Sequence, residues 1–130
     1  MTKQKTLILG LAAALTGCST QPKNFFTANL ENVCSHAIRV TAVDYSNAKK
    51  AFTPNQEIAA GEAVEILSYI SFSEGLESSI PNTYRLDIKA HEQTISLDKQ
   101  LLIAQLKNSP STHTSKNATT WTIRDSSLCP

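Results

Sequence analysis

Apolar and polar residues alternate along several short segments, and this pattern constrains the fold more than any other feature of the 130-residue sequence. Successive side chains of a strand point to opposite faces, so a period of two predicts a strand with one buried face. Five segments show the alternation: 36–45, 64–72, 84–90, 95–97 and 119–123. In the longest, Leu67 and Tyr69 add a second apolar side to Val64 and Ile66. We therefore expect 64–72 to be a central strand.

Five strands separated by turn signals, with at most one helix, are typical of a mainly β domain. We expect an antiparallel β-sandwich of immunoglobulin-like architecture, with a small α+β fold as the alternative. Segments 84–90 and 95–97 are expected to form a hairpin, although their connection lacks Asn-Gly or Asp-Gly. Trp121 is the only tryptophan, and we expect it to pack in the core.

The segments between the strands are mostly polar. We expect loops at 46–56, 73–82 and 108–120. The last of these is rich in Ser, Thr and Asn, and we expect it to be a mobile loop. Segment 99–107 is ambiguous. Asp98 suits the N-cap of a helix that places Leu101, Leu102, Gln105 and Leu106 on one face, whereas a strand places Leu101, Ile103 and Gln105 together. Unbranched helix formers favour the helix.

The first 17 residues have the order of an export signal. Lys3 and Lys5 precede an apolar run at 7–15, which is too short for a membrane span of about 20 residues. The run closes on Leu15-Thr16-Gly17-Cys18. This motif resembles the lipobox of bacterial lipoproteins, which implies cleavage before Cys18 and acylation of that cysteine. An ordinary secretory signal is the alternative.

The lipoprotein resemblance also carries expectations about location. In that family an aspartate just after the acylated cysteine retains the protein in the inner membrane, and here the position is Ser19. We therefore expect a lipid anchor in the outer membrane of a Gram-negative cell, facing the periplasm, with the cell surface as the alternative. Because each buried CH₂ contributes about 0.8 kcal/mol, several acyl chains hold a protein firmly to a bilayer.

The length of the processed chain allows one domain. Removing 1–17 leaves 113 residues, the size of a single core. We expect a signal peptide at 1–17, a lipidated N-terminus and tether at 18–32, and one disulfide-tied β domain at 33–130. Phe25 and Phe26 in the tether either dip into the bilayer interface or pack on the domain, and we favour packing.

Cys34 and Cys129 remain once Cys18 is assigned to lipid. In an oxidising periplasm such a pair predicts a disulfide; two free thiols or half of a metal site are the alternatives. The bridge would close a loop over almost the whole domain, which in the chain-entropy model contributes about 4–5 kcal/mol. Because Cys34 precedes the first predicted strand and Cys129 follows the last, we expect those two strands to be adjacent and antiparallel.

The charge of the processed chain is close to balanced. Two of the 12 basic residues leave with the signal, so 10 face 11 acidic ones. This balance gives no basic field for nucleic acid. The stretch 51–84 contains five glutamates and no Lys or Arg. Glu62, Glu65 and Glu74 in it are a candidate acidic patch for a basic protein partner, with an ordinary solvated face as the alternative.

The sequence lacks the motifs that carry common enzyme chemistry. It has no nucleophile elbow, zinc-protease motif, paired Cys-x-x-Cys or glycine-rich phosphate loop. His36, His91 and His113 are scattered, and we interpret them as surface histidines. We expect no catalytic residues, no metal, no cofactor and no small-molecule substrate.

These observations favour a non-enzymatic outer-membrane lipoprotein whose periplasmic domain binds another protein, as an accessory or assembly part of an envelope or secretion complex. A sheet edge that accepts a partner strand is a natural means. The alternative is an inhibitor or immunity lipoprotein that blocks a toxin or hydrolase by inserting 108–120 or 73–82. A third hypothesis, catalysis, requires a pocket that gathers His36 or His91 with carboxylates.

Overall fold

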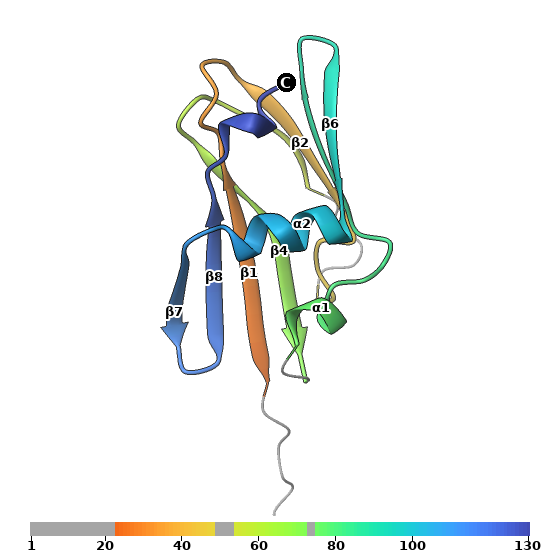
Figure 1. Ribbon diagram of the computed structural model, residues 1–130, viewed down its shortest axis with the longest axis vertical. Helices are drawn as coiled ribbons and strands as arrows, with labels where there is room; N and C mark the ends of the chain where they lie inside the picture. The colour runs from red at the N-terminus through yellow and green to blue at the C-terminus, as the bar shows by residue number, and fades with distance from the viewer. Residues whose placement is uncertain (1–22, 49–53, 73–74) are drawn as a thin grey trace, which may run out of the picture.

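Two four-stranded sheets pack against each other in the computed structural model, which describes residues 23–48, 54–72 and 75–130. Sheet A has the order β4-β1-β8-β7 and sheet B the order β3-β2-β5-β6 (Figure 1). Sheet A consists of β1 (Asn24–Glu31), β4 (Ala63–Ser71), β7 (Ser111–Ser115) and β8 (Ala118–Ile123). Sheet B consists of β2 (Ile38–Val43), β3 (Asn55–Ile58), β5 (Arg85–Ala90) and β6 (Gln93–Asp98). The predicted β-sandwich is confirmed, with a parallel β1–β8 pair among otherwise antiparallel pairs.

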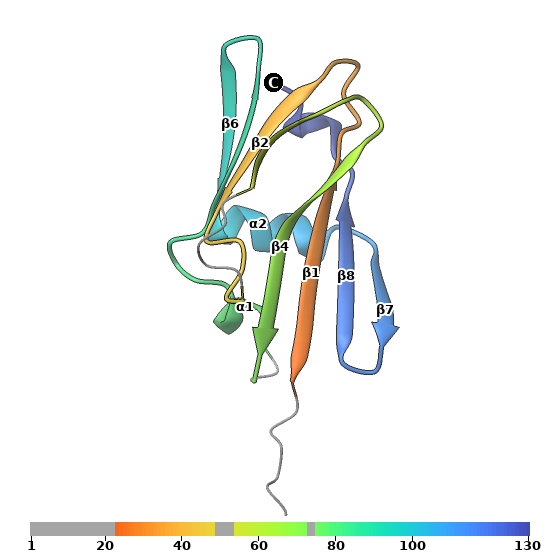
Figure 2. The same cartoon turned by 180° about the vertical axis from the view of Figure 1, so that it is seen from behind.

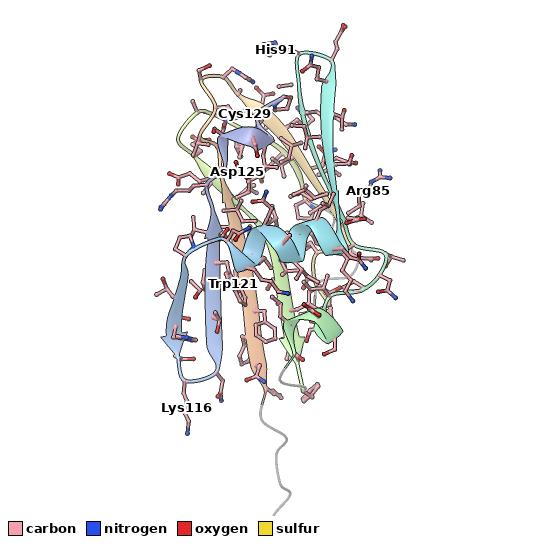
Figure 3. All side chains as sticks on the ribbon, in the orientation of Figure 1. Arg85, His91, Lys116, Trp121, Asp125 and Cys129 are labelled. Carbon is pink, nitrogen blue, oxygen red and sulfur yellow. A yellow bond between two sulfur atoms is a disulfide. The ribbon has the colours of Figure 1, made fainter. Side chains whose placement is uncertain are left out.

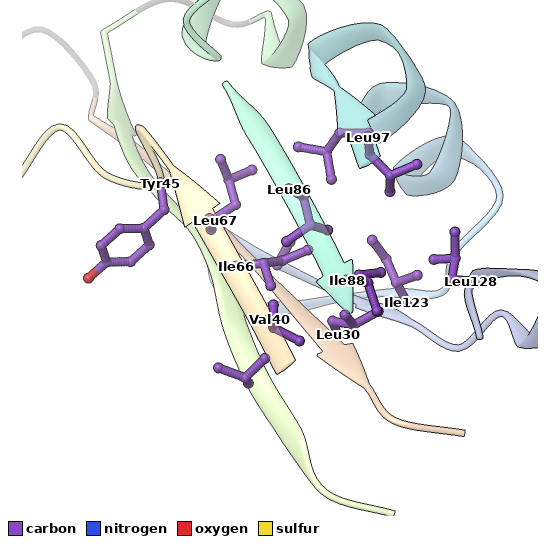
Figure 4. Packing of buried hydrophobic residues seen from close by; sticks show 14 of the residues in the cluster. Leu30, Val40, Tyr45, Ile66, Leu67, Leu86, Ile88, Leu97, Ile123 and Leu128 are labelled. Atoms are coloured by element: carbon purple, nitrogen blue, oxygen red, sulfur yellow. The ribbon is translucent and has the colours of Figure 1, made fainter. Parts of the chain in front are cut away.

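Three short helical segments complete the fold: α1 (Leu76–Ser79), α2 (Lys99–Lys107) and the 3₁₀ turn η1 (Ser126–Leu128). The core lies between the sheets, where inward side chains of both are fully buried (Figure 4). Its members include Leu30, Val40, Ile66, Leu86 and Ile123. Each such side chain contributes about 1.5–3 kcal/mol through burial. The expected signal peptide, Cys18 and residues 19–22 lie outside the described residues.

Strand β1 corrects the predicted tether, because residues 24–31 form a strand between β4 and β8. Polar outward residues made this segment resemble a linker, while Phe26, Ala28 and Leu30 alternate with them on the inner face. Phe26 packs on the domain, with its ring centroid 5.8 Å from that of Trp121. Phe25 points the other way and is 43% exposed.

Strand β4 confirms the predicted strand but not its predicted position. It lies at the edge of sheet A. Ala28 pairs with Leu67 and Asn29 with Glu65, so Ile66 is an extra residue on β4. Such a bulge moves the inward side of the strand from even to odd positions. Leu67 and Tyr69 are therefore buried by the change of face, and not by a second layer.

The cysteine prediction is confirmed in its pairing and wrong in its topology. Cys34 and Cys129 form a disulfide across a sequence separation of 95. The strands that follow Cys34 and precede Cys129 are β2 and β8, which lie in different sheets. The disulfide links the β1–β2 connection to the end of the chain, because β1 occupies the place next to β8 that we expected for the first predicted strand.

The predicted hairpin is confirmed as β5–β6, whose pairs run from Arg85 and Asp98 to Ala90 and Gln93. Its two connecting residues, His91 and Glu92, have φ of 52° and 64°. A two-residue hairpin of type I′ has positive φ at both positions, which Asn and Gly usually supply. The cross-strand pairing of β5 and β6 imposes this conformation on two residues that rarely adopt it.

Segment 99–107 is the helix α2, as favoured from the sequence. Asp98 is its N-cap and accepts a hydrogen bond from the Leu101 backbone N–H at 2.9 Å. Leu102 and Leu106 are buried, whereas Leu101 is 52% exposed. The helix leads from β6 in sheet B to β7 in sheet A and crosses between the two sheets (Figure 2).

The predicted mobile loop at 108–120 is wrong, because this segment contains β7 and the first half of β8. The prediction failed because an edge strand with both faces exposed needs no apolar residue, and all five residues of β7 are exposed. Alternating Thr residues still favour extended backbone. Strand β3 was missed for a related reason, since it is only four residues long and three of them are exposed.

Asn32 joins three segments at the end of β1. Its side-chain amide donates to the carbonyls of His36 (2.9 Å) and Ile58 (3.1 Å), and its Oδ1 accepts from the Cys34 N–H (2.9 Å). Its backbone N–H donates to the Glu62 carbonyl, and its carbonyl accepts from the Gly61 N–H, both at 2.8 Å. The side chain is 1% exposed, so water cannot replace these partners.

We expect Asn32→Ala to lower the free energy of unfolding by about 3 kcal/mol, because it leaves buried backbone groups without partners at a cost of about 1–3 kcal/mol each. Urea denaturation monitored by Trp121 fluorescence measures the change. Asn29→Ala on the same strand is the matched control and should stay within about 0.5 kcal/mol. Equal effects of the two substitutions would contradict this role of Asn32.

Candidate binding surface

The two sheets offer four edges, and the edge of β4 is covered by residues 45–47. The Ser68 N–H donates to the Tyr45 carbonyl at 2.8 Å. The Asn47 side chain accepts from the Ile70 N–H at 3.0 Å and donates to the Ile70 carbonyl at 2.6 Å. These bonds occupy backbone groups that a further strand would need.

Two of the remaining edges carry charged residues, which discourage strand addition. Strand β3 contains Glu57, whose carboxylate pairs with Arg39 at 3.5 Å. Strand β6 ends with Asp98 and starts next to Glu92. Strand β7, Ser-Thr-His-Thr-Ser, contains no Asp, Glu, Lys or Arg and has every residue exposed. Within the described part of the chain, it is the one edge strand of the four with neither a covering segment nor a charged residue of its own, although Lys116 follows it directly.

The outward backbone groups of β7 follow from its register with β8. The Thr122 N–H donates to the Pro110 carbonyl at 3.2 Å, so these two residues form a hydrogen-bonded pair. Such pairs alternate with non-bonded ones in an antiparallel ladder. Thr112 opposite Thr120 is then the next bonded pair, and His113 opposite Thr119 is a non-bonded pair. The N–H and carbonyl of His113 therefore point away from β8.

Beside this edge, sheet A has a half-covered aromatic surface. Phe26 on β1 continues the inward row of Ala28 and Leu30, and Trp121 on β8 continues that of Ile123. Ala28 and Ile123 are completely buried, whereas Phe26 and Trp121 are half-buried. Figure 3 places Trp121 below α2, and α1 lies beside β4 (Figure 1). The helices thus leave the β8 side of this inner surface open.

The β7 edge and the Phe26–Trp121 pair together form what we call the β7 surface. His113 links its two parts, since its Nδ1 lies 3.2 Å from the Thr119 Oγ1 on β8. Aromatic rings beside unpaired strand backbone suit an extended segment, because the backbone supplies hydrogen bonds and the rings contact alternate side chains. The surface has no charged residue in its strand, so it favours an uncharged segment.

Two of the three glutamates of the candidate acidic patch lie in the described part of the chain. Glu62 is exposed, and its Oε2 accepts from the Ala59 N–H at 3.1 Å. Glu65 is exposed on β4, and Glu74 lies outside the described residues. Two other acids of the same stretch are paired with bases from beyond it: Glu57 with Arg39, and Glu77 with Lys107 at 2.8 Å. The Lys107 hydrogen bond and charge lower the pKa of Glu77.

The fold brings together two histidines that are far apart in sequence. The ring centroids of His36, before β2, and His91, in the β5–β6 turn, lie 4.5 Å apart. His36 Nε2 is buried and has no hydrogen-bond partner among the described residues. In that part of the chain no hydrogen bond or ion pair joins either imidazole to a carboxylate, and no three His, Cys, Asp or Glu residues are grouped as metal ligands would be.

Two hollows lie near the helices. One of about 420 Å³ is lined by residues of α1 and α2, where Lys99 donates to Asn82 at 3.2 Å and Lys107 pairs with Glu77. The other, of about 350 Å³, lies around Asp44 and Tyr69. Tyr69 donates to the Asp44 carbonyl at 2.9 Å, and burial, assisted by the Asp44 charge, raises its pKa. In both hollows, several of the polar lining groups are thus engaged in bonds within the protein.

Over residues 23–48, 54–72 and 75–130, no helix has both the length and the apolar character needed to cross a bilayer. Comparison of the chain with protein-family models, with curated proteins and with solved structures gave no match.

Proposed function

We propose that this protein is a non-enzymatic lipoprotein of the bacterial outer membrane, anchored through acylated Cys18 and facing the periplasm. Its domain binds an extended segment of another envelope protein, which adds as a strand to the edge of β7. In this role it is an accessory or assembly part of an envelope or secretion complex. The observation that carries the binding mode is the exposed, uncharged and uncovered edge of β7.

Edges of this kind are normally protected in natural proteins by charges, prolines, bulges or covering segments. The other three edges of the domain follow this rule through Asn47, Glu57 and Asp98. On β7 such features lie at its ends: Pro110 precedes the strand, a register shift follows His113, and Lys116 follows the last residue. An open edge left beside protected ones supports its use for binding.

The aromatic pair supports the same conclusion. Phe26 and Trp121 keep part of their surface exposed although α2 covers the neighbouring core. Aromatic residues are enriched at interfaces because they bury a large area at a small entropic cost. A strand added next to β7 would extend the inner face of sheet A, and its inward side chains would lie beside this pair.

The lipid anchor would act on the same interaction through local concentration. Tethering a domain and its partner to one membrane raises their effective concentration without any new contact. The inhibitor hypothesis, in which 108–120 or 73–82 enters an enzyme cleft, is the alternative. The first segment forms β7 and part of β8 and the second includes the short helix α1, so strand addition at β7 has the more specific support.

The strand-addition mode predicts different effects for two substitutions at His113. His113→Pro removes the outward N–H without breaking a bond to β8, as tolerated on edge strands, whereas His113→Ala keeps this N–H. With a photoactivatable residue at Thr112 in intact cells, we expect His113→Ala to retain its crosslinked partner. His113→Pro should lose it about tenfold or more, since an unpaired carbonyl costs about 1–3 kcal/mol.

Thermal unfolding of both His113 variants controls for folding. Equal crosslinking of two folded variants would exclude strand addition at β7.

Neighbouring phenylalanines on opposite faces of β1 provide a second test. We expect Phe26→Ala to weaken binding of the crosslinked partner about tenfold, the effect of removing one aromatic contact from an interface. Phe25→Ala, one residue away on the outer face, should leave partner affinity unchanged. Titration of the partner segment against both variants measures this. A loss on Phe25→Ala alone would place the partner on the other face of sheet A.

The anchor predicts a modified N-terminus. Mass spectrometry of the protein from membranes should find a chain that starts at Cys18 and carries acyl groups. In the lipoprotein family an aspartate after the cysteine causes retention, so Ser19→Asp should move the protein to the inner-membrane fraction, with Ser19→Asn as the uncharged control. An unmodified Cys18, or a freely soluble protein, would refute the anchor.

A further inference from the structure

Exposed aromatic side chains gather at the end of sheet A where β1 begins. Phe25 is 43% and Phe72 is 58% exposed. Asn24 pairs with Ser71, the residue before Phe72, and Phe25 pairs with Ile70. The two rings therefore belong to adjacent positions at one end of one sheet. The disulfide lies beyond the other end of β1, near the C-terminus (Figure 1).

Smaller apolar groups extend this surface. Phe25 lies beside Ala118 on β8 as well as Ile70 on β4. Because they are its direct register partners, both neighbours share the outer face with the Phe25 ring, and both are half-buried. Contiguous apolar surface that remains exposed in a folded protein marks an interaction site more often than scattered residues do.

Two lysines flank the same end. Lys23 immediately precedes β1, and Lys116 lies in the β7–β8 turn. The turn is held against β1, because the Phe25 N–H donates to the Asn117 carbonyl at 2.7 Å. Both lysines are exposed, and neither belongs to an ion pair among the described residues. We call Lys23, Phe25, Ile70, Phe72 and Lys116 the β1 end.

The β1 end is also the part of the domain closest along the chain to the proposed anchor. Asn24 lies six positions after Cys18, and six residue steps span at most about 20 Å when extended. An acylated Cys18 would thus hold this end within about 20 Å of the bilayer, whatever path the connection takes.

We infer that the β1 end docks on the lipid surface itself. Phe25 and Phe72 enter the boundary between headgroups and acyl chains, where Trp, Phe and Leu side chains of interfacial segments are buried. Lys23 and Lys116 contact the phosphates of anionic headgroups, each strengthening attachment to an anionic surface. This inference rests on the proposed lipid anchor, which supplies the proximity that two rings and two lysines alone do not give.

Depth-dependent quenching tests the docking. The full chain, exported and purified from membranes in acylated form, is reconstituted in vesicles of phosphatidylethanolamine and phosphatidylglycerol that contain brominated lipids. In a Trp121→Phe background, which removes the only tryptophan, Phe72→Trp reports on the β1 end. Leu101→Trp is the matched control, because Leu101 is 52% exposed on α2.

We expect quenching and a blue shift for Phe72→Trp and neither for Leu101→Trp. Equal quenching of the two reporters would overturn the inference. If Trp121→Phe unfolds the protein, the same difference is measured with Trp121 retained in both variants.

The lysines provide an independent readout. Lys23→Gln and Lys116→Gln should each lower the docked-to-undocked ratio about fivefold on anionic vesicles and leave it unchanged on neutral ones. An unchanged ratio on anionic vesicles would show that the two lysines do not contact the anionic headgroups.

Failure of the anchor is distinguished from failure of the docking. If mass spectrometry finds Cys18 unmodified, the proposed anchor is refuted. The docking is then measured on protein whose Cys18 is coupled to a maleimide lipid, with the same two tryptophan reporters.

Discussion

The fold depends on one buried amide at the point where the chain passes from sheet A to sheet B. Asn32 is bonded to the start of β2, to the end of β3 and to the turn before β4, so it fixes the relative positions of four strands. It also holds the Cys34 N–H, which brings the cysteine to the place where Cys129 arrives. Because the amide is excluded from water, its bonds are strong only when all of them form together.

The two faces of β1 contribute to two surfaces with different proposed roles. Phe26 faces inward beside Trp121, and Phe25 faces outward beside Ile70. Strand geometry sends neighbouring side chains to opposite faces, so one dipeptide contributes to both the proposed partner surface and the proposed lipid surface. A partner segment bound along β7 would then run beside the bilayer-facing end of the same sheet.

The sequence predicted the elements whose apolar residues keep one period and whose ends carry clear caps. Strands β2, β5 and β8 and the Asp98-capped helix are of this kind, and β4 was predicted as a strand although its period changes at the bulge. It did not predict β1, whose polar outward residues follow directly on a signal-like segment. The bulge in β4 was not recognised, because the change of face after Ile66 makes Leu67 and Tyr69 resemble the second apolar side of a central strand.

The candidate site was the part least accessible to sequence reasoning. The β7 edge consists of backbone groups, which are the same for every residue, and its side chains show no apolar period. The ring pair joins residues 26 and 121, which meet only through the parallel β1–β8 pairing. The sequence did contain two signals of this site: the alternating threonines of 112–122 and the row of inward residues that starts at Phe26.

The parallel β1–β8 pair has a consequence for how the protein would mature if it is exported as proposed. A chain that emerges from the translocation channel with its N-terminus first exposes β1 long before residues 118–123 appear. One side of β1 therefore stays open as an unsatisfied edge until nearly the whole polypeptide has crossed, a vulnerable intermediate for aggregation or proteolysis. Oxidation of the thiols at 34 and 129 cannot precede that moment either, so under the proposed export folding would be completed only after translocation.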